Sequence, residues 1–173
     1  MSVLTDRHFG GSHEDLRSVR QTVTLPLLCK DFILEKTQIV EAKRVGADCV
    51  LLIAAALQPP HMRNLLEFAH QLDMQVLVET RDEHEIDRAM SAGGRLIGVN
   101  ARDLDTFELD PTLPGRLRKH VPDGFTYVAE SGVKSVEDAV RLRDAGVDAI
   151  LVGSYLMQAP NPGETLRQLI LQL

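Results

Sequence analysis

One pattern of hydrophobic and polar positions repeats along the chain. A short apolar run is followed by a polar turn and then by a segment whose apolar residues recur at helical spacing. The runs are rich in Val, Ile and Leu with little alternation, which is typical of strands buried on both faces. These predicted strands lie at residues 2–5, 25–32, 48–55, 74–79, 95–100, 125–131 and 148–153.

Residues that favour helix ends flank the segments between these runs. Ser12 and Ser135 each stand just before an amphipathic segment, where a hydroxyl can cap the first turn of a helix. Gly46 and Gly146 follow two such segments and fit the left-handed position that ends a helix. Strict alternation of strand and helix predicts a parallel sheet with right-handed crossovers.

The number of units indicates the architecture. About seven short and similar βα units are more than an open sheet usually has, whereas a (β/α)8 TIM barrel has eight of them and usually about 250 residues. The chain has 173 residues. We therefore expect a single α/β domain over residues 1–173, a TIM barrel that is short by one unit.

The composition of the chain argues against some classes of binding partner. The chain is 44% hydrophobic and 25% charged, with a formal net charge of −6. An acidic chain without basic blocks argues against nucleic acid or an anionic membrane as a partner. No apolar stretch is long enough to span a membrane and no signal peptide begins the sequence, so we expect a cytoplasmic protein.

The cysteines and histidines show no metal-binding spacing. Cys29 and Cys49 stand in apolar runs and are interpreted as reduced core residues. The six histidines include no pair four residues apart. We expect neither a metal site nor a cofactor.

The ends of the predicted strands carry the candidate chemistry. In a barrel of this kind the active site lies at the carboxyl ends of the strands. Lys30, Glu79, Asn100 and Glu130 all stand at such ends. Any one of them could simply mark where the sheet meets water, but two carboxylates and a lysine in one mouth are a common acid–base arrangement.

Glycine and serine follow the last two predicted strands, in "AESG" and "LVGS". Loops at these positions of a barrel often bind phosphate through backbone N–H groups, and glycine lets the backbone approach the anion closely. Either motif alone is weak evidence, but their order and place near the chain end favour a phosphate site.

Several motifs together resemble one family. "CKDFIL", "GADCVLLIAAAL", "LVET", "IGVNARDLDTFELD", "AESGV" and "LVGSYLM", with the opening "SVLTDRHFGGSHEDL", resemble indole-3-glycerol phosphate synthase over essentially the whole chain. The resemblance implies ring closure and decarboxylation of a phosphorylated small molecule, 1-(2-carboxyphenylamino)-1-deoxyribulose 5-phosphate, in tryptophan biosynthesis, with release of CO₂ and water.

The resemblance also implies roles for the strand-end residues. Lys30 matches a general acid, Glu79 a carboxylate that assists proton transfer or stabilises positive charge, and Asn100 a donor to substrate hydroxyls. Glu130 and Ser131 match residues that contact the sugar portion.

It implies the walls of the site as well. Gly132, Gly153 and Ser154 match the phosphate loops. The residues that match apolar walls around the anthranilate ring are Phe9, Phe32 and Leu51, which could equally be plain core residues. Arg102 matches a motif arginine that we expect to be structural, paired near Glu79 or Asp103.

One feature of the family has no counterpart. Its members carry an N-terminal extension and a first strand that supplies a second lysine, a glutamate and a serine. We therefore expect a barrel with its first strand missing, truncated at the N-terminus, with impaired activity. Its two open strand edges could close by shifted pairing, be covered in a homo-oligomer, or belong to a fragment of a longer protein.

Two other functions stay open. The chain could be a non-catalytic truncated barrel or fragment that retains a phosphate-binding site. It could also be another phosphosugar barrel such as phosphoribosylanthranilate isomerase, although "CKDF" and "VNARDL" argue against that family.

Overall fold

The computed structural model describes residues 1–171, in which strands and helices alternate along the chain. The strands are β1 (Ser2–Leu4), β2 (Leu28–Lys30), β3 (Cys49–Ile53), β4 (Gln75–Thr80), β5 (Leu96–Asn100), β6 (Thr126–Glu130) and β7 (Ala149–Leu151). The α-helices are α1 (His13–Thr22), α2 (Lys36–Arg44), α3 (Pro59–Gln71), α4 (Glu83–Ser91), α5 (Leu113–Leu117), α6 (Val136–Asp144), α7 (Ser154–Met157) and α8 (Pro162–Ile170). Short 3-10 helices lie at η1 (Arg7–Phe9), η2 (Ala54–Ala56) and η3 (Arg118–His120).

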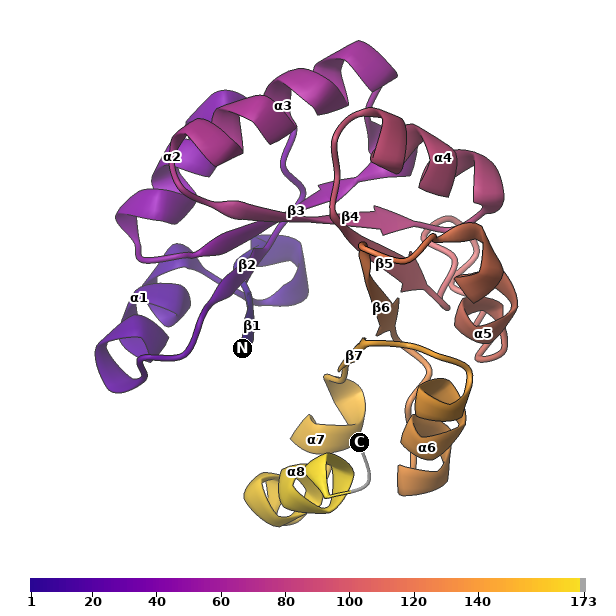
Figure 1. The fold of residues 1–173 in the computed structure, drawn as a ribbon. Coiled ribbons are helices and arrows are strands. Elements are labelled where there is room, and N and C mark those ends of the chain that lie inside the picture. The colour runs from indigo at the N-terminus through magenta and orange to yellow at the C-terminus, as the bar shows by residue number, and fades with distance from the viewer. Residues whose placement is uncertain (172–173) are drawn as a thin grey trace.

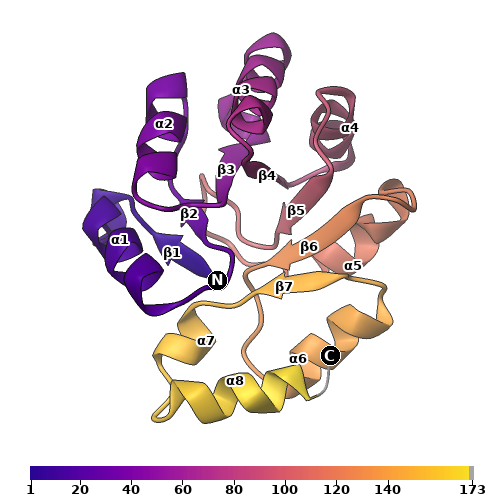
Figure 2. The same cartoon turned by 60° about the vertical axis from the view of Figure 1, so that its left-hand side comes forward.

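The strands form one parallel sheet in sequence order, from β1 to β7. The sheet curls, and helices α1 to α6 cover its outer side (Figures 1 and 2). Within residues 1–171, β1 and β7 each pair with one neighbour only. The fold therefore confirms the predicted α/β barrel with seven βα units, and all seven predicted strands form.

Helix ends follow the predicted residues. The hydroxyls of Ser12 and Ser135 each accept a hydrogen bond, 3.2 Å long, from the backbone N–H three residues later. Gly46 and Gly146 have φ values of 101° and 82°, in the left-handed region that glycine adopts without strain. These turns bring each helix back to the start of the next strand.

An aspartate two residues after each of these glycines joins neighbouring strands. Oδ2 of Asp48 accepts a hydrogen bond of 2.8 Å from the backbone N–H of Leu27, just before β2. Oδ2 of Asp148 accepts one of 2.7 Å from the backbone N–H of Tyr127 in β6. Each aspartate therefore satisfies a backbone donor near the amino end of the adjacent strand.

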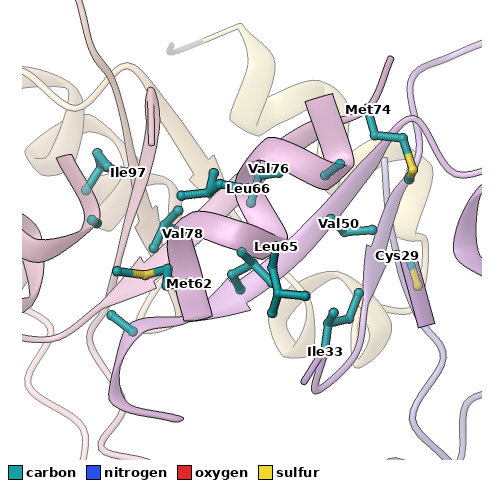
Figure 3. Packing of buried hydrophobic residues seen from close by; sticks show 14 of the residues in the cluster. Cys29, Ile33, Val50, Met62, Leu65, Leu66, Met74, Val76, Val78 and Ile97 are labelled. Carbon is teal, nitrogen blue, oxygen red and sulfur yellow. The ribbon is translucent and has the colours of Figure 1, made fainter. Parts of the chain in front are cut away.

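Alternate residues of β4 face two different cores. Val76 and Val78 of β4 face outwards and belong to the main cluster, where α3 packs on the sheet (Figure 3). Leu77 faces inwards and belongs to a smaller cluster inside the curl with Leu51 and Ile53. Burial on both faces explains why the strands read as nearly continuous apolar runs. Each helix in the described part of the chain is too short or too polar to cross a bilayer.

Candidate active site

The inward-facing residues form two layers. At the amino ends of the strands the layer is apolar and includes Leu51 and Leu77. Side chains two positions further along the same face reach the carboxyl ends, because strand residues alternate between faces. That second layer contains the four predicted catalytic residues, Lys30, Glu79, Asn100 and Glu130.

Lys30 lies between the two carboxylates. Its Nζ is 3.4 Å from Oε2 of Glu79 and 3.4 Å from Oε2 of Glu130. Both carboxylates are buried, with 3% and 2% of their surface exposed, whereas Lys30 is half-buried. The three residues come from β2, β4 and β6, so the curl of the sheet brings together positions up to 100 apart in sequence.

Asn100 connects Glu79 to the following loop. Its Nδ2 donates to Oε1 of Glu79 at 2.9 Å, and its Oδ1 accepts from the backbone N–H of Arg102 at 3.0 Å. Asn100 is 7% exposed. These two bonds fix which way the amide points, and they leave Oε2 of Glu79 directed at Lys30.

Arg102 was expected to pair near Glu79 or Asp103, and this prediction was wrong. Its guanidinium donates to the carbonyl oxygen of Phe107 at 3.1 Å. The ion pair with Asp103 comes instead from Arg81, whose Nε is 2.9 Å from Oδ2 of Asp103. Arg81 also donates to the carbonyl oxygen of Asn100 at 3.3 Å. Arg81 directly follows the last residue of β4, so it fastens the end of β4 to the loop after β5.

Burial sets the protonation of Glu130. Burial, followed by the negative charge of Glu79, raises the pKa of Glu130 to about 8, although the charge of Lys30 opposes this. The Glu130 carboxyl group therefore takes up a proton more readily than an exposed glutamate does. Among the described residues its Oε1 is buried without a hydrogen-bond partner. A buried polar atom of this kind is costly unless a bound group uses it.

Lys30 keeps its proton in the same surroundings. Burial alone would lower the pKa of its ammonium group, but the charges of Glu130 and Glu79 outweigh this and raise the pKa above its usual 10.5. The mouth thus combines an ammonium group with a carboxyl group of raised pKa, and both are groups that can donate a proton.

Two aromatic rings lie on the segments that follow β1 and β2. The rings of Phe9 and Phe32 are stacked, with centroids 6.1 Å apart and an angle of 21° between their planes. They are 56% and 40% exposed, which is unusual for core residues. Leu51, the third predicted wall residue, is 2% exposed and lies in the apolar layer beneath, so the structure does not group it with the two rings.

The predicted phosphate residues lie on the loops after β6 and β7. Ser131 and Gly132 directly follow Glu130 and have φ values of 64° and 84°, so the chain turns sharply there. Gly153 and Ser154 are exposed at the start of α7. The first N–H groups of a helix have no partner within the helix. Backbone donors of both loops thus stand at the carboxyl end of the sheet.

Sequence reasoning missed two residues that shape this layer, Arg81 and Gly98. Gly98 is the inward residue of β5 two positions before Asn100, and a Cβ at this position would come within 2.1 Å of Oε1 of Glu130. A glycine inside a strand often marks a close approach of another group, which was the available signal. Arg81 had no comparable signal, because its partner is set by the fold.

Comparison with known proteins gives concordant findings. A family model described as indole-3-glycerol phosphate synthase matches residues 1–169. "Indole-3-glycerol phosphate synthase 2" of Streptomyces coelicolor is 48% identical over 171 residues, which cover 98% of this chain and 66% of that protein. "Indole-3-glycerol phosphate synthase" of Koribacter versatilis is 49% identical with the same coverage. The chain thus spans just under two thirds of the length of these relatives.

A solved structure shows the same fold with little sequence similarity. The crystal structure titled KGPDC from Streptococcus mutans superposes with a TM-score of 0.77 at 15% identity, covering 99% of this chain and 83% of that one. At that identity the likeness concerns the fold alone.

Proposed function

Because the chain belongs to the indole-3-glycerol phosphate synthase family, we propose that it carries the acid–base centre of that reaction. The substrate is 1-(2-carboxyphenylamino)-1-deoxyribulose 5-phosphate, which loses CO₂ and water on ring closure. The observation that carries the proposal is the position of Lys30, 3.4 Å from each of two buried carboxylates at the barrel mouth.

Each residue has a role that fits its surroundings. Lys30 donates its proton to the substrate carbonyl oxygen as the anthranilate ring carbon bonds to the carbonyl carbon. Glu79 stabilises the positive charge that develops on the ring and its nitrogen. The C–C bond to the carboxyl group then breaks, its electron pair returns to the ring and CO₂ leaves. The hydroxyl group formed at the former carbonyl carbon takes up a proton and leaves as water, and the neighbouring CH₂ loses a proton to form the C=C bond of the indole. A charged group placed where opposite charge develops during the reaction lowers the free energy of the transition state most effectively.

The remaining predicted residues hold the substrate. Asn100 donates to a substrate hydroxyl, and Glu130 with Ser131 contacts the sugar portion. Phe9 and Phe32 lie against the anthranilate ring, with Leu51 beneath. The residues whose backbone amides bind the phosphate are Gly132, Gly153 and Ser154, and a phosphate soak should place an anion there. Anions bound only elsewhere would contradict that assignment.

The finer proposal concerns how much activity these 173 residues have by themselves. A positioned acid or base contributes about 10²–10⁴-fold, and the chain spans 66% of its Streptomyces coelicolor relative. We propose that the chain alone turns over the substrate at least about 10²-fold more slowly than a synthase of full family length.

The test compares two proteins in an assay of the fluorescent indole product. One is the 173-residue chain, and the other is the same chain preceded by the N-terminal third of the Streptomyces coelicolor relative. In the fused protein Lys30→Ala should lower kcat by at least about 10²-fold, while the surface variant Lys43→Ala should not change it. A fused protein that folds and has no activity, or a Lys30→Ala variant with full activity, would refute the acid–base proposal.

A further proposal concerns association. Within residues 1–171 the outer edges of β1 and β7 have unpaired backbone groups, which favour pairing with another chain. We propose that a second copy covers these edges when the 173-residue chain is studied alone. Sedimentation over a range of concentrations tests this, and a monomer at every concentration would contradict it.

A further inference from the structure

A cluster of metal-ligating side chains lies outside the acid–base centre, at the same end of the sheet. A ring nitrogen of His13, Sγ of Cys29 and a carboxylate oxygen of Asp31 all lie within 4.8 Å of one another. His13 is the first residue of α1, Cys29 lies in β2, and Asp31 follows that strand. We propose that these three residues bind a divalent transition-metal ion of the Zn²⁺ or Co²⁺ type.

Strand geometry separates this cluster from the proposed catalytic residues. Cys29 and Asp31 stand two positions apart, so their side chains leave the same face of β2, while Lys30 between them leaves the other. Cys29 belongs to the outer core, on the helix-covered side of the sheet (Figure 3). The ammonium of Lys30 points inwards, to Glu79 and Glu130. The metal would therefore not displace the acid–base group.

The donor set matches borderline metals. Imidazole nitrogen, thiolate sulfur and carboxylate oxygen are the ligands of tetrahedral Zn²⁺, at about 2.0–2.3 Å. Such bonds place two ligand atoms about 3.5 Å apart, so shifts of roughly an ångström convert the observed cluster into a site. Hard cations such as Mg²⁺ and Ca²⁺ prefer oxygen ligands only, which this cluster does not supply.

Neighbouring hydrogen bonds already orient the donors. The backbone N–H of Phe32 donates to Oδ1 of Asp31 at 2.8 Å, which leaves Oδ2 directed into the cluster. The hydroxyl of Thr5 donates to that Oδ2 at 2.7 Å and lies 3.2 Å from Sγ of Cys29. When the metal takes Oδ2, the Thr5 hydroxyl is free to donate to the thiolate. Outer hydrogen bonds of this kind commonly support metal ligands.

The cluster has one open side. Cys29 is fully buried, the Asp31 side chain is 18% exposed, and the His13 side chain is 36% exposed. An ion can enter beside His13, and a water molecule can complete four ligands. Cys29 binds as thiolate, so its S–H proton is released to solvent when the Cys29–metal bond forms.

The alternative is a surface pair with no metal. Nε2 of His13 is 3.9 Å from Oδ2 of Asp31, which also describes a weak ion pair beside a buried core cysteine. Titration of the reduced, chelator-treated chain with Co²⁺ distinguishes the two. The proposal predicts one bound Co²⁺ per chain, with a thiolate-to-cobalt charge-transfer band that Zn²⁺ removes by displacement.

Variants assign the band to the cluster. His13→Ala, a surface change that leaves the core intact, should weaken Co²⁺ binding by at least about 10-fold. Cys29→Ser should remove the charge-transfer band. Cys49→Ser and His70→Ala supply the same residue types elsewhere in the fold and should leave the band unchanged. A band that survives His13→Ala at full affinity, one that disappears with Cys49→Ser, or no band at several equivalents of Co²⁺ would overturn the site.

Discussion

Gly98 and Glu130 are in direct contact across neighbouring strands at the mouth of the barrel. A methyl group on Gly98 would lie 2.1 Å from Oε1 of Glu130 and 3.2 Å from Cδ1 of Leu77. The carboxylate cannot move away cheaply, because it is buried and its Oε2 faces Lys30. Glycine at this position therefore determines where the Glu130 carboxylate stands.

Gly98→Ala should consequently displace the Glu130 carboxylate and lower both activity and stability. A misplacement of about 1 Å at a reacting group can cost roughly 10²-fold in rate, and overpacking costs about 1–3 kcal/mol. Indole-product kinetics and urea unfolding of the fused protein measure the two effects. Gly115→Ala is the control, because its added Cβ would meet only Ala145, at an ordinary 3.5 Å. Equal kinetics for the two variants would contradict the assigned role of Gly98.

Asn100→Asp should place a second carboxylate against Glu79. The Asn100 amide donates to Oε1 of Glu79 at 2.9 Å, and an aspartate there can make that contact only by holding a proton. We expect kcat to fall by at least about 10²-fold and to recover partly as the pH is lowered. Asn64→Asp on the exposed side of α3 is the matched control. A loss of kcat that is the same at every pH would contradict the shared-proton explanation.

Features that depend on residues close together in the sequence could be predicted, whereas contacts between residues far apart in the sequence could not. Strand and helix positions follow from local patterns, as the caps at Ser12 and Ser135 show, and the alternation of units implied the parallel order. The strand ends placed Lys30 and Glu130 at one mouth. Contacts that form only when the sheet curls could not be predicted from local patterns. Arg81 pairs with Asp103, which lies on another loop, and Leu51 lies in the apolar layer beneath the aromatic rings.

The metal-binding proposal shows the same limit. His13, Cys29 and Asp31 follow no ligand spacing along the chain, so composition and spacing predicted no metal site. They converge because β1 and β2 pair in register, with Val3 opposite Cys29, and because α1 begins beside the end of β2. Cys29 and Asp31 share a face because side chains two residues apart on a strand point the same way. The histidine comes from a different element, α1, so its place beside them depends on the fold.

Asp148→Ala should destabilise the chain although Asp148 lies far from the mouth. Its Oδ2 accepts from the backbone N–H of Tyr127 at 2.7 Å, and a buried donor left unpaired costs about 1–3 kcal/mol. Urea unfolding at neutral pH measures the loss. Asp144→Ala, which removes an exposed ion pair to Arg143, should change the unfolding free energy by less than about 0.5 kcal/mol. Similar losses in both variants would show that the strand-joining bond is unimportant.

Stability should fall as the pH rises from about 4.5 to about 8, because of Glu130. Folding raises the pKa of this carboxyl from its usual 4.5 to about 8, chiefly by burial and then by the charge of Glu79. Between those values the folded chain binds more protons than the unfolded chain, so the free energy of unfolding decreases with pH. The raised pKa of Lys30 acts only above its usual 10.5, outside this window.

Glu130→Gln removes this titration and should flatten that part of the pH profile. The stabilisation that the wild type loses across the window is on the order of a few kcal/mol, so the variant should gain relative stability towards pH 8–9. Urea unfolding at closely spaced pH values from 4 to 9 measures the two slopes. Glu137→Gln is the control, because Glu137 is exposed and its pKa is lowered, first by a backbone hydrogen bond. If Glu130→Gln and the wild type have parallel profiles through this window, Glu130 is ionised in the folded chain and cannot act as a proton donor at neutral pH.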